Sequence, residues 1–154
     1  MNERGDAHLP AELEQFLTQP RIAVLATVRR DNSPATTACW YDLEDGRLLI
    51  TMYANAHRLP NLRRNPHVAM TIVGEDPYQH VSLSGTVHEL WDDPDLKVMD
   101  RLSMRYTGEP WPERQTCVSA LVEIDRWHTY GLLSEASDYS SPKAPPSGGG
   151  DSPT

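Results

Sequence analysis

Short runs of apolar and β-branched residues recur along the chain, separated by Asp, Asn, Pro and Gly residues that favour turns. In the run 80–90, Val81, Leu83, Gly85 and Val87 alternate with polar residues, which is the period of a half-buried strand. The pattern predicts about six strands joined by hairpins. They span residues 21–30, 35–43, 47–53, 67–74, 80–90 and 117–131.

Two longer stretches have helical spacing instead. Residues 10–20 are amphipathic and lie between two prolines. A helix is also predicted within residues 91–108, with Asp93 as the N-cap, Pro94 at the first helical position and Gly108 at the end. The chain is therefore expected to be mainly β or α+β, and hairpin-linked buried strands favour a closed barrel over an open sheet.

A chain of 154 residues is most simply one domain, and the predicted elements fall within residues 10–133. Residues 1–9 are expected to form a loose N-terminus. Residues 134–154 are rich in Ser, Pro and Gly and are expected to be disordered. There is no signal-peptide pattern and no apolar run of membrane-spanning length, so a cytoplasmic protein with no membrane contact is expected.

The charge balance is acidic, with 14 Lys and Arg against 22 Asp and Glu and a formal net charge of -8. This argues against a nucleic-acid partner, which would require a broad basic face. Within residues 57–67, "HRLPNLRRNPH", three arginines and two histidines nevertheless gather around a short helix predicted at 60–65. Arg58, with His57 beside it, is suited to bind a phosphate through two hydrogen bonds. The alternative is an ordinary solvated helix.

The chain lacks the familiar catalytic motifs HExxH, GxSxG, the Walker loop and GxGxxG. We therefore predict no catalytic side chain and no metal site. Cys39 and Cys117 lie far apart and are expected to be buried free thiols. If the protein is an enzyme, a cofactor must carry most of the bond-making.

An ordered set of short segments resembles the pyridoxamine 5'-phosphate oxidase-like flavin and deazaflavin oxidoreductases, and among them the coenzyme F420-dependent branch of actinobacteria. The resemblance covers roughly residues 10–131. It implies an FMN-binding split barrel, a six-stranded split β-barrel that forms a homodimer with two cofactor sites at the subunit interface. The matching residues are Leu25-Ala26-Thr27, Asp31, Pro34, Trp40-Tyr41, Arg58, Asn61 to Pro66, and Tyr130-Gly131.

The resemblance also implies a set of cofactor-binding residues. Arg58 and His57 stand at the family's basic phosphate ligands, although lysine is commoner there than arginine, and Tyr78 is placed to reach the partner subunit's site. Trp40 and Tyr53 have an alternative as plain barrel core. The full set is Thr36, Thr37, Ala38, Cys39, Trp40, Thr51, Met52, Tyr53, His57, Arg58, Asn61, Leu62, Arg64 and Tyr78.

The cofactor implied is F420, with FMN as the alternative. F420 carries an anionic oligoglutamate tail, which Arg29, Arg30, Arg63 and Arg64 would attract if the first hairpin turn approaches the short helix. The expected function is hydride transfer between F420 and a small conjugated or unsaturated acceptor. Two alternatives stay open, an FMN-dependent oxidoreductase and a non-catalytic cofactor carrier.

Overall fold

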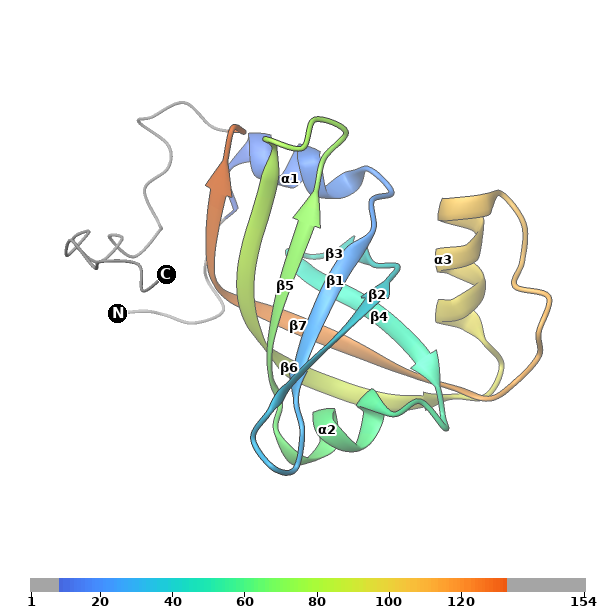
Figure 1. The fold of residues 1–154 in the computed structure, drawn as a ribbon. Helices are drawn as coiled ribbons and strands as arrows, with labels where there is room; N and C mark the ends of the chain where they lie inside the picture. Colours follow the sequence, from blue (N-terminus) through green and yellow to red (C-terminus); the bar gives the residue numbers. More distant parts are fainter. Residues whose placement is uncertain (1–8, 133–154) are drawn as a thin grey trace.

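A computed structural model of the chain describes residues 9–132. One antiparallel sheet with the strand order β2-β1-β5-β6-β7-β4-β3 curls into a split barrel (Figure 1). The expected mainly β class is confirmed. The elements are α1 (Ala11–Thr18), β1 (Ala23–Val28), β2 (Pro34–Cys39), β3 (Asp42–Glu44), β4 (Arg47–Tyr53), α2 (Arg58–Arg64), β5 (His67–Val73), β6 (His80–Asp93), α3 (Lys97–Thr107) and β7 (Cys117–Tyr130).

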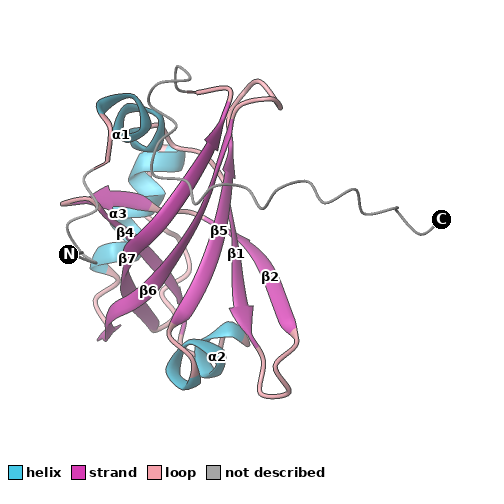
Figure 2. Ribbon diagram, turned by 90° about the vertical axis from the view of Figure 1, so that its left-hand side faces the viewer, coloured by secondary structure: helices cyan, strands magenta, loops and turns pink. Residues whose placement is uncertain are grey.

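The three helices of the described residues pack against different parts of the barrel. α1 lies at one end of the barrel, α2 lies at the other end beside the β1–β2 hairpin, and α3 stands against β4 on the outside (Figures 1 and 2). No helix among the described residues is long and apolar enough to cross a membrane. The expected loose N-terminus and disordered tail fall outside the described residues, except Leu9, which is buried in the main core.

The single strand predicted at residues 35–43 is two strands, because the chain turns at Trp40 and Tyr41. The Tyr41 side chain is completely buried, and its hydroxyl donates a hydrogen bond to the Gln19 carbonyl at 3.2 Å. This inward turn ends β2 and starts β3 in a new direction. The structure therefore has seven strands where six were predicted.

The expected hairpins are present between β1 and β2, between β3 and β4, and between β5 and β6, but hairpins alone do not account for the sheet. β4 pairs with β7 and not with β2, with Thr51 opposite Ser119 in the register. The edge strands β2 and β3 follow each other in sequence but sit at opposite ends of the strand order. The barrel is thus split between these two strands, and it is not fully closed.

The third helix begins later than its sequence signals predicted. β6 continues to Asp93, and α3 starts at Lys97, so Pro94 does not occupy the first helical position. Asp93 still caps the helix, since its carboxylate accepts hydrogen bonds from the backbone N–H groups of Lys97 at 3.0 Å and Val98 at 2.8 Å. The intervening turn requires Leu96 to adopt a left-handed conformation, with φ of 59°.

Arg105 fastens α3 to the C-terminal end of α1. Its guanidinium donates to the carbonyls of Thr18 at 2.7 Å and Gln19 at 2.9 Å, and it also pairs with Asp42 at 3.3 Å. The carbonyls at a helix C-terminus have no partners within the helix, so a cation there satisfies them and the helix dipole together. Arg105 therefore sets how α3 lies against the barrel.

We predict that Arg105→Ala lowers the free energy of unfolding by about 2–3 kcal/mol, since hydrogen bonds that involve a charged group are worth that much when the group is largely buried. Urea denaturation measures the change. Arg101→Ala is the matched control on the same helix. Arg101 also pairs with Asp42 but is 41% exposed, so its loss should cost under about 1 kcal/mol. Equal losses would contradict the assignment.

Candidate functional site

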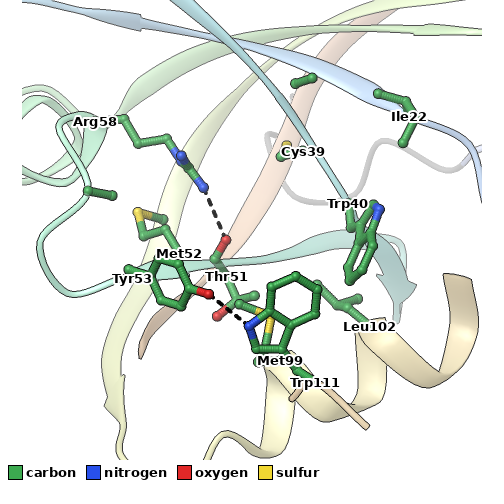
Figure 3. A pocket seen from close by; sticks show the side chains of 12 residues that line it. Ile22, Cys39, Trp40, Thr51, Met52, Tyr53, Arg58, Met99, Leu102 and Trp111 are labelled. Carbon is green, nitrogen blue, oxygen red and sulfur yellow. Dashed lines mark hydrogen bonds between the residues drawn. The ribbon is translucent and has the colours of Figure 1, made fainter. Parts of the chain in front are cut away.

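Two adjoining cavities open along β2 and the C-terminal end of β4. The first has a volume of about 430 Å³ and is mainly apolar. Strands β2 and β4 form one side of it, and α3 with the loop after it forms another (Figure 3). Its lining residues are Ile22, Ala38, Cys39, Trp40, Thr51, Met52, Tyr53, Ala56, Arg58, Met99, Leu102 and Trp111.

The second cavity, of about 700 Å³, is more polar and lies toward α2 and the first hairpin. It shares Ala56 and Arg58 with the apolar cavity, so Arg58 stands at the junction of the two. Its lining residues are Thr27, Arg29, Ala35, Thr36, Thr37, Ala56, His57, Arg58 and Asn61.

Helix α2 begins at Arg58, two residues before the start predicted for it. Pro60 fits in its first turn, where a backbone N–H has no helical partner. Leu59 and Leu62 are buried in the barrel core and fix the orientation of the helix. Asn61 faces the polar cavity, and its side-chain amide donates to the hydroxyl of Thr27 at 3.2 Å.

Arg58 is half-buried and has unused hydrogen-bonding capacity. One terminal nitrogen donates to the Thr51 carbonyl at 3.3 Å, while the buried Nε has no partner among the described residues. Burial lowers the pKa of Arg58, but an arginine stays charged throughout the physiological range. An unpaired buried donor costs about 1–3 kcal/mol, and more on a charged group. The arrangement fits an anionic group bound at the junction of the cavities.

Aromatic side chains form the part of the apolar cavity far from Arg58 (Figure 3). Trp40 stacks on Tyr106 with the ring centroids 5.0 Å apart, and Trp111 meets Trp40 edge-on at 5.5 Å. The Tyr53 hydroxyl donates to Glu113 at 2.6 Å and accepts from Trp111 Nε1 at 2.8 Å. The hydrogen bond to Glu113 is the main cause of the raised pKa of Tyr53. The cavity therefore suits a flat ring system.

Most of the residues predicted for the site line one of these two cavities, and three do not. Leu62 lies in the core with 2% of its surface exposed. Arg64 donates to the Val28 carbonyl at 3.1 Å and to Asn61 at 3.0 Å. Tyr78 is 72% exposed, on the β5–β6 loop at the end of the barrel opposite α2 (Figure 1).

Sequence reasoning missed the residues that come from outside the predicted motif. Ile22, Met99, Leu102 and Trp111 all line the apolar cavity. A bulky aromatic in the proline-rich stretch 108–116 was the one available signal, since such a residue usually has a packing partner.

The four arginines proposed as tail contacts differ in where they lie relative to the cavities. Arg64 bonds to the end of β1, so the first hairpin does contact α2 as that hypothesis requires. Arg29 lines the polar cavity and is held by the Pro34 carbonyl at 2.8 Å. Arg30 and Arg63 are exposed and line neither cavity. No group of His, Cys, Asp and Glu suited to a metal ion gathers within residues 9–132.

Comparison with solved structures places the chain among split barrels. It is 29% identical to a protein described as an F420 reductase, with a TM-score of 0.71, and the match covers 77% of this chain and 98% of that one. A conserved hypothetical protein from Mycobacterium tuberculosis is 26% identical, with a TM-score of 0.64 and coverage of 84% and 89%.

A heme storage protein from Vibrio cholerae shares the fold at 14% identity, with a TM-score of 0.61 and coverage of 81% and 96%. No curated protein matches the sequence significantly. The model of the pyridoxamine 5'-phosphate oxidase family, by contrast, matches residues 9–129, almost the whole of the described chain. The chain belongs to the pyridoxamine 5'-phosphate oxidase family.

Proposed function

We propose that the protein is an F420-dependent oxidoreductase that reduces a small conjugated or unsaturated organic acceptor. The observation that carries the proposal is the Arg58 guanidinium, half-buried and with an unpaired Nε, at the junction between an apolar and a polar cavity. A cofactor with a flat ring and a phosphate matches this pair of cavities. Arg58 would hold the phosphate, with His57 beside it.

The residues of the apolar cavity that come from β2, β4 and the turn after β2 would bind and orient the ring and exclude water. Trp40, Met52 and Tyr53 offer ring and thioether surface, and the backbone of β2 and β4 offers polar groups for the ring edge. When bound, reduced F420 supplies a hydride. The acceptor's C=C π bond breaks and two C–H bonds form, one from that hydride and one from a solvent proton. No side chain is assigned as the proton donor.

Two observations favour F420 over FMN. The 29%-identical structure described as an F420 reductase is matched over 98% of its own length. The polar cavity carries Arg29 in addition to Arg58, so a second cation is available to the anionic tail that F420 has and FMN lacks. FMN remains the alternative cofactor, and a carrier without catalysis the alternative function.

We also propose a cytoplasmic homodimer with the cofactor sites at the interface. β2 is an edge strand whose residues are all exposed or half-buried, so a second copy could cover it (Figure 2). Val24 on the adjacent strand β1 and Val73 on β5, the next strand, expose 40% and 46% of their surface. Tyr78 would contact the partner's site.

Titration of the purified protein with F420 and with FMN, followed by visible absorption and fluorescence, tests the function. We expect tight F420 binding, and a Kd raised about 10- to 100-fold in Arg58→Gln, since a charge-assisted hydrogen bond is worth about 1.5–3 kcal/mol. Arg47→Gln, at a half-buried arginine that pairs with Glu123 outside both cavities, is the control and should leave Kd within about twofold.

Three outcomes of the titration would contradict parts of the proposal. Tighter binding of FMN than of F420 would replace the cofactor. Tight F420 binding without turnover on a broad panel of acceptors would favour a carrier. Binding of neither cofactor would overturn the function.

Cys39 offers an independent probe of the apolar cavity. Burial raises the pKa of its thiol to about 11, and the nearby Arg58 only partly opposes this. The reactive thiolate is therefore scarce at neutral pH, and iodoacetamide alkylation should be slow at pH 8 and accelerate about tenfold per pH unit toward pH 11. Saturating F420 should protect Cys39, as measured by peptide mass spectrometry.

The second cysteine provides the internal control for this labelling. Cys117 is fully buried and should stay unmodified with or without F420. Unchanged Cys39 labelling at saturating F420 would show that the ring binds elsewhere.

The tail hypothesis predicts that Arg29→Ala weakens the binding of F420 with a long oligoglutamate tail by about two- to fivefold. The loss is this small because an exposed ion pair contributes at most about 1 kcal/mol. Binding of a tail-less analogue should change less, because it offers Arg29 no anionic tail to contact. The double variant Arg63→Ala/Arg64→Ala should behave similarly. Kd values at low and high salt measure this, with Arg47→Ala as the control. Equal losses for the two ligands would contradict tail contacts.

A further inference from the structure

The apolar cavity has a wall that the ring-binding strands do not provide. Met99 and Leu102 come from α3, and Trp111 comes from the loop that joins α3 to β7. These side chains lie across the cavity from Cys39 of β2 (Figure 3). The wall and its residues are separate from the strands and from α2, which carry the predicted cofactor contacts.

Trp111 is held in place by polar contacts at both ends of the residue. Its indole N–H donates to the Tyr53 hydroxyl at 2.8 Å, and its backbone N–H donates to Asp100 at 3.1 Å. Arg114 closes the loop by bonding to both the Trp111 carbonyl, at 2.9 Å, and the Asp100 carboxylate, at 2.8 Å. A ring fixed in this way is a preorganised contact surface and needs little ordering when a ligand binds.

The charges around the cavity limit what can bind against this wall. Arg58 is the one charged residue that lines the apolar cavity, and under the proposed function it is occupied by the cofactor phosphate. Arg114 contacts the Trp111 carbonyl, but its charge is already paired with Asp100 at 2.8 Å, and the Tyr53 hydroxyl beside Trp111 contacts the negative Glu113 carboxylate. An anionic acceptor would lose hydration beside this wall, and the one cation placed next to Trp111 among the described residues is already neutralised by Asp100.

We propose that Trp111 is the specificity-determining residue of an acceptor subsite formed with Met99 and Leu102, and that the acceptor is a flat, uncharged molecule with an aromatic ring conjugated to its reducible double bond. This inference rests on the proposed function for the identity of the reductant. The acceptor stacks between the cofactor ring and the α3 side of the cavity, and its aryl group contacts Trp111. As above, the acceptor's C=C π bond breaks, and the two new C–H bonds use a hydride from reduced F420 and a proton from solvent.

The test compares three acceptors with reduced F420: 4-phenylbut-3-en-2-one, its para-carboxylate, and cyclohex-2-en-1-one, which has no aryl group. The wild type should show the lowest KM for the neutral aryl enone. Trp111→Ala should raise that KM about tenfold, consistent with the loss of an aromatic contact, and should change the KM of cyclohexenone less than twofold. The Kd for F420 should stay within about twofold.

Further variants separate the contact from general loosening of the loop. Trp111→Phe keeps a ring but loses the bond to Tyr53, so its KM should fall between those of the wild type and Trp111→Ala. Met99→Ala should raise the KM of the aryl enone, whereas Met104→Ala, on the exposed side of the same helix, should not. Equal effects of Trp111→Ala on all three acceptors, or a matching loss of F420 affinity, would overturn the subsite.

A second readout keeps the inference testable if the proposed function fails. Isothermal titration calorimetry measures 4-phenylbut-3-en-2-one binding to the wild type and to Trp111→Ala without any cofactor. Weaker binding to the variant supports the subsite even when neither F420 nor FMN binds. Equal binding to both proteins would overturn it.

Discussion

Asp93 stands at the end of β6 with 5% of its surface exposed, and its carboxylate links three elements. It accepts hydrogen bonds from the first free backbone N–H groups of α3, those of Lys97 and Val98, and it contacts the Ser119 hydroxyl of β7 at 3.5 Å. Ser119 in turn is 2.9 Å from the Thr51 hydroxyl of β4. A buried carboxylate must be satisfied by such donors, so α3 can start only where its amides reach Asp93. The position of the wall against the apolar cavity follows from this constraint.

Thr51 connects that network to the anion site. Its hydroxyl belongs to the Asp93 network, while its carbonyl accepts a hydrogen bond from the Arg58 side chain. The same residue therefore anchors the α3 wall on one side and orients the cation on the other. Because β4 is paired with β7 from Leu48 to Tyr53, neither contact can shift without disturbing the sheet. This rigidity is what a preorganised binding site requires.

The sequence predicted local structure well and long-range structure poorly, and the reasons are physical. Periodicity and turn residues located β4 to the residue and β7 to within one residue, but nothing local specifies that they pair with each other across more than sixty residues. The proline rule misplaced the start of α3 because Asp93 caps the helix from outside the normal N-cap position. Arg58 was identifiable because its motif is contiguous. Trp111 was not, because its position depends on how α3 and its loop pack against β4.

An acidic chain can carry a cationic site because electrostatic effects at this scale are local. At physiological ionic strength, exposed charges more than about 8 Å apart are largely screened, so the net charge of -8 has little influence inside the cavities. The nearby charges are Arg58 and Arg29 at one end and Glu113 beside Tyr53 at the other. A ligand with an anionic end and a neutral ring is favoured in one direction only, with the anion at Arg58. The charge pattern thus orients a ligand as well as binding it.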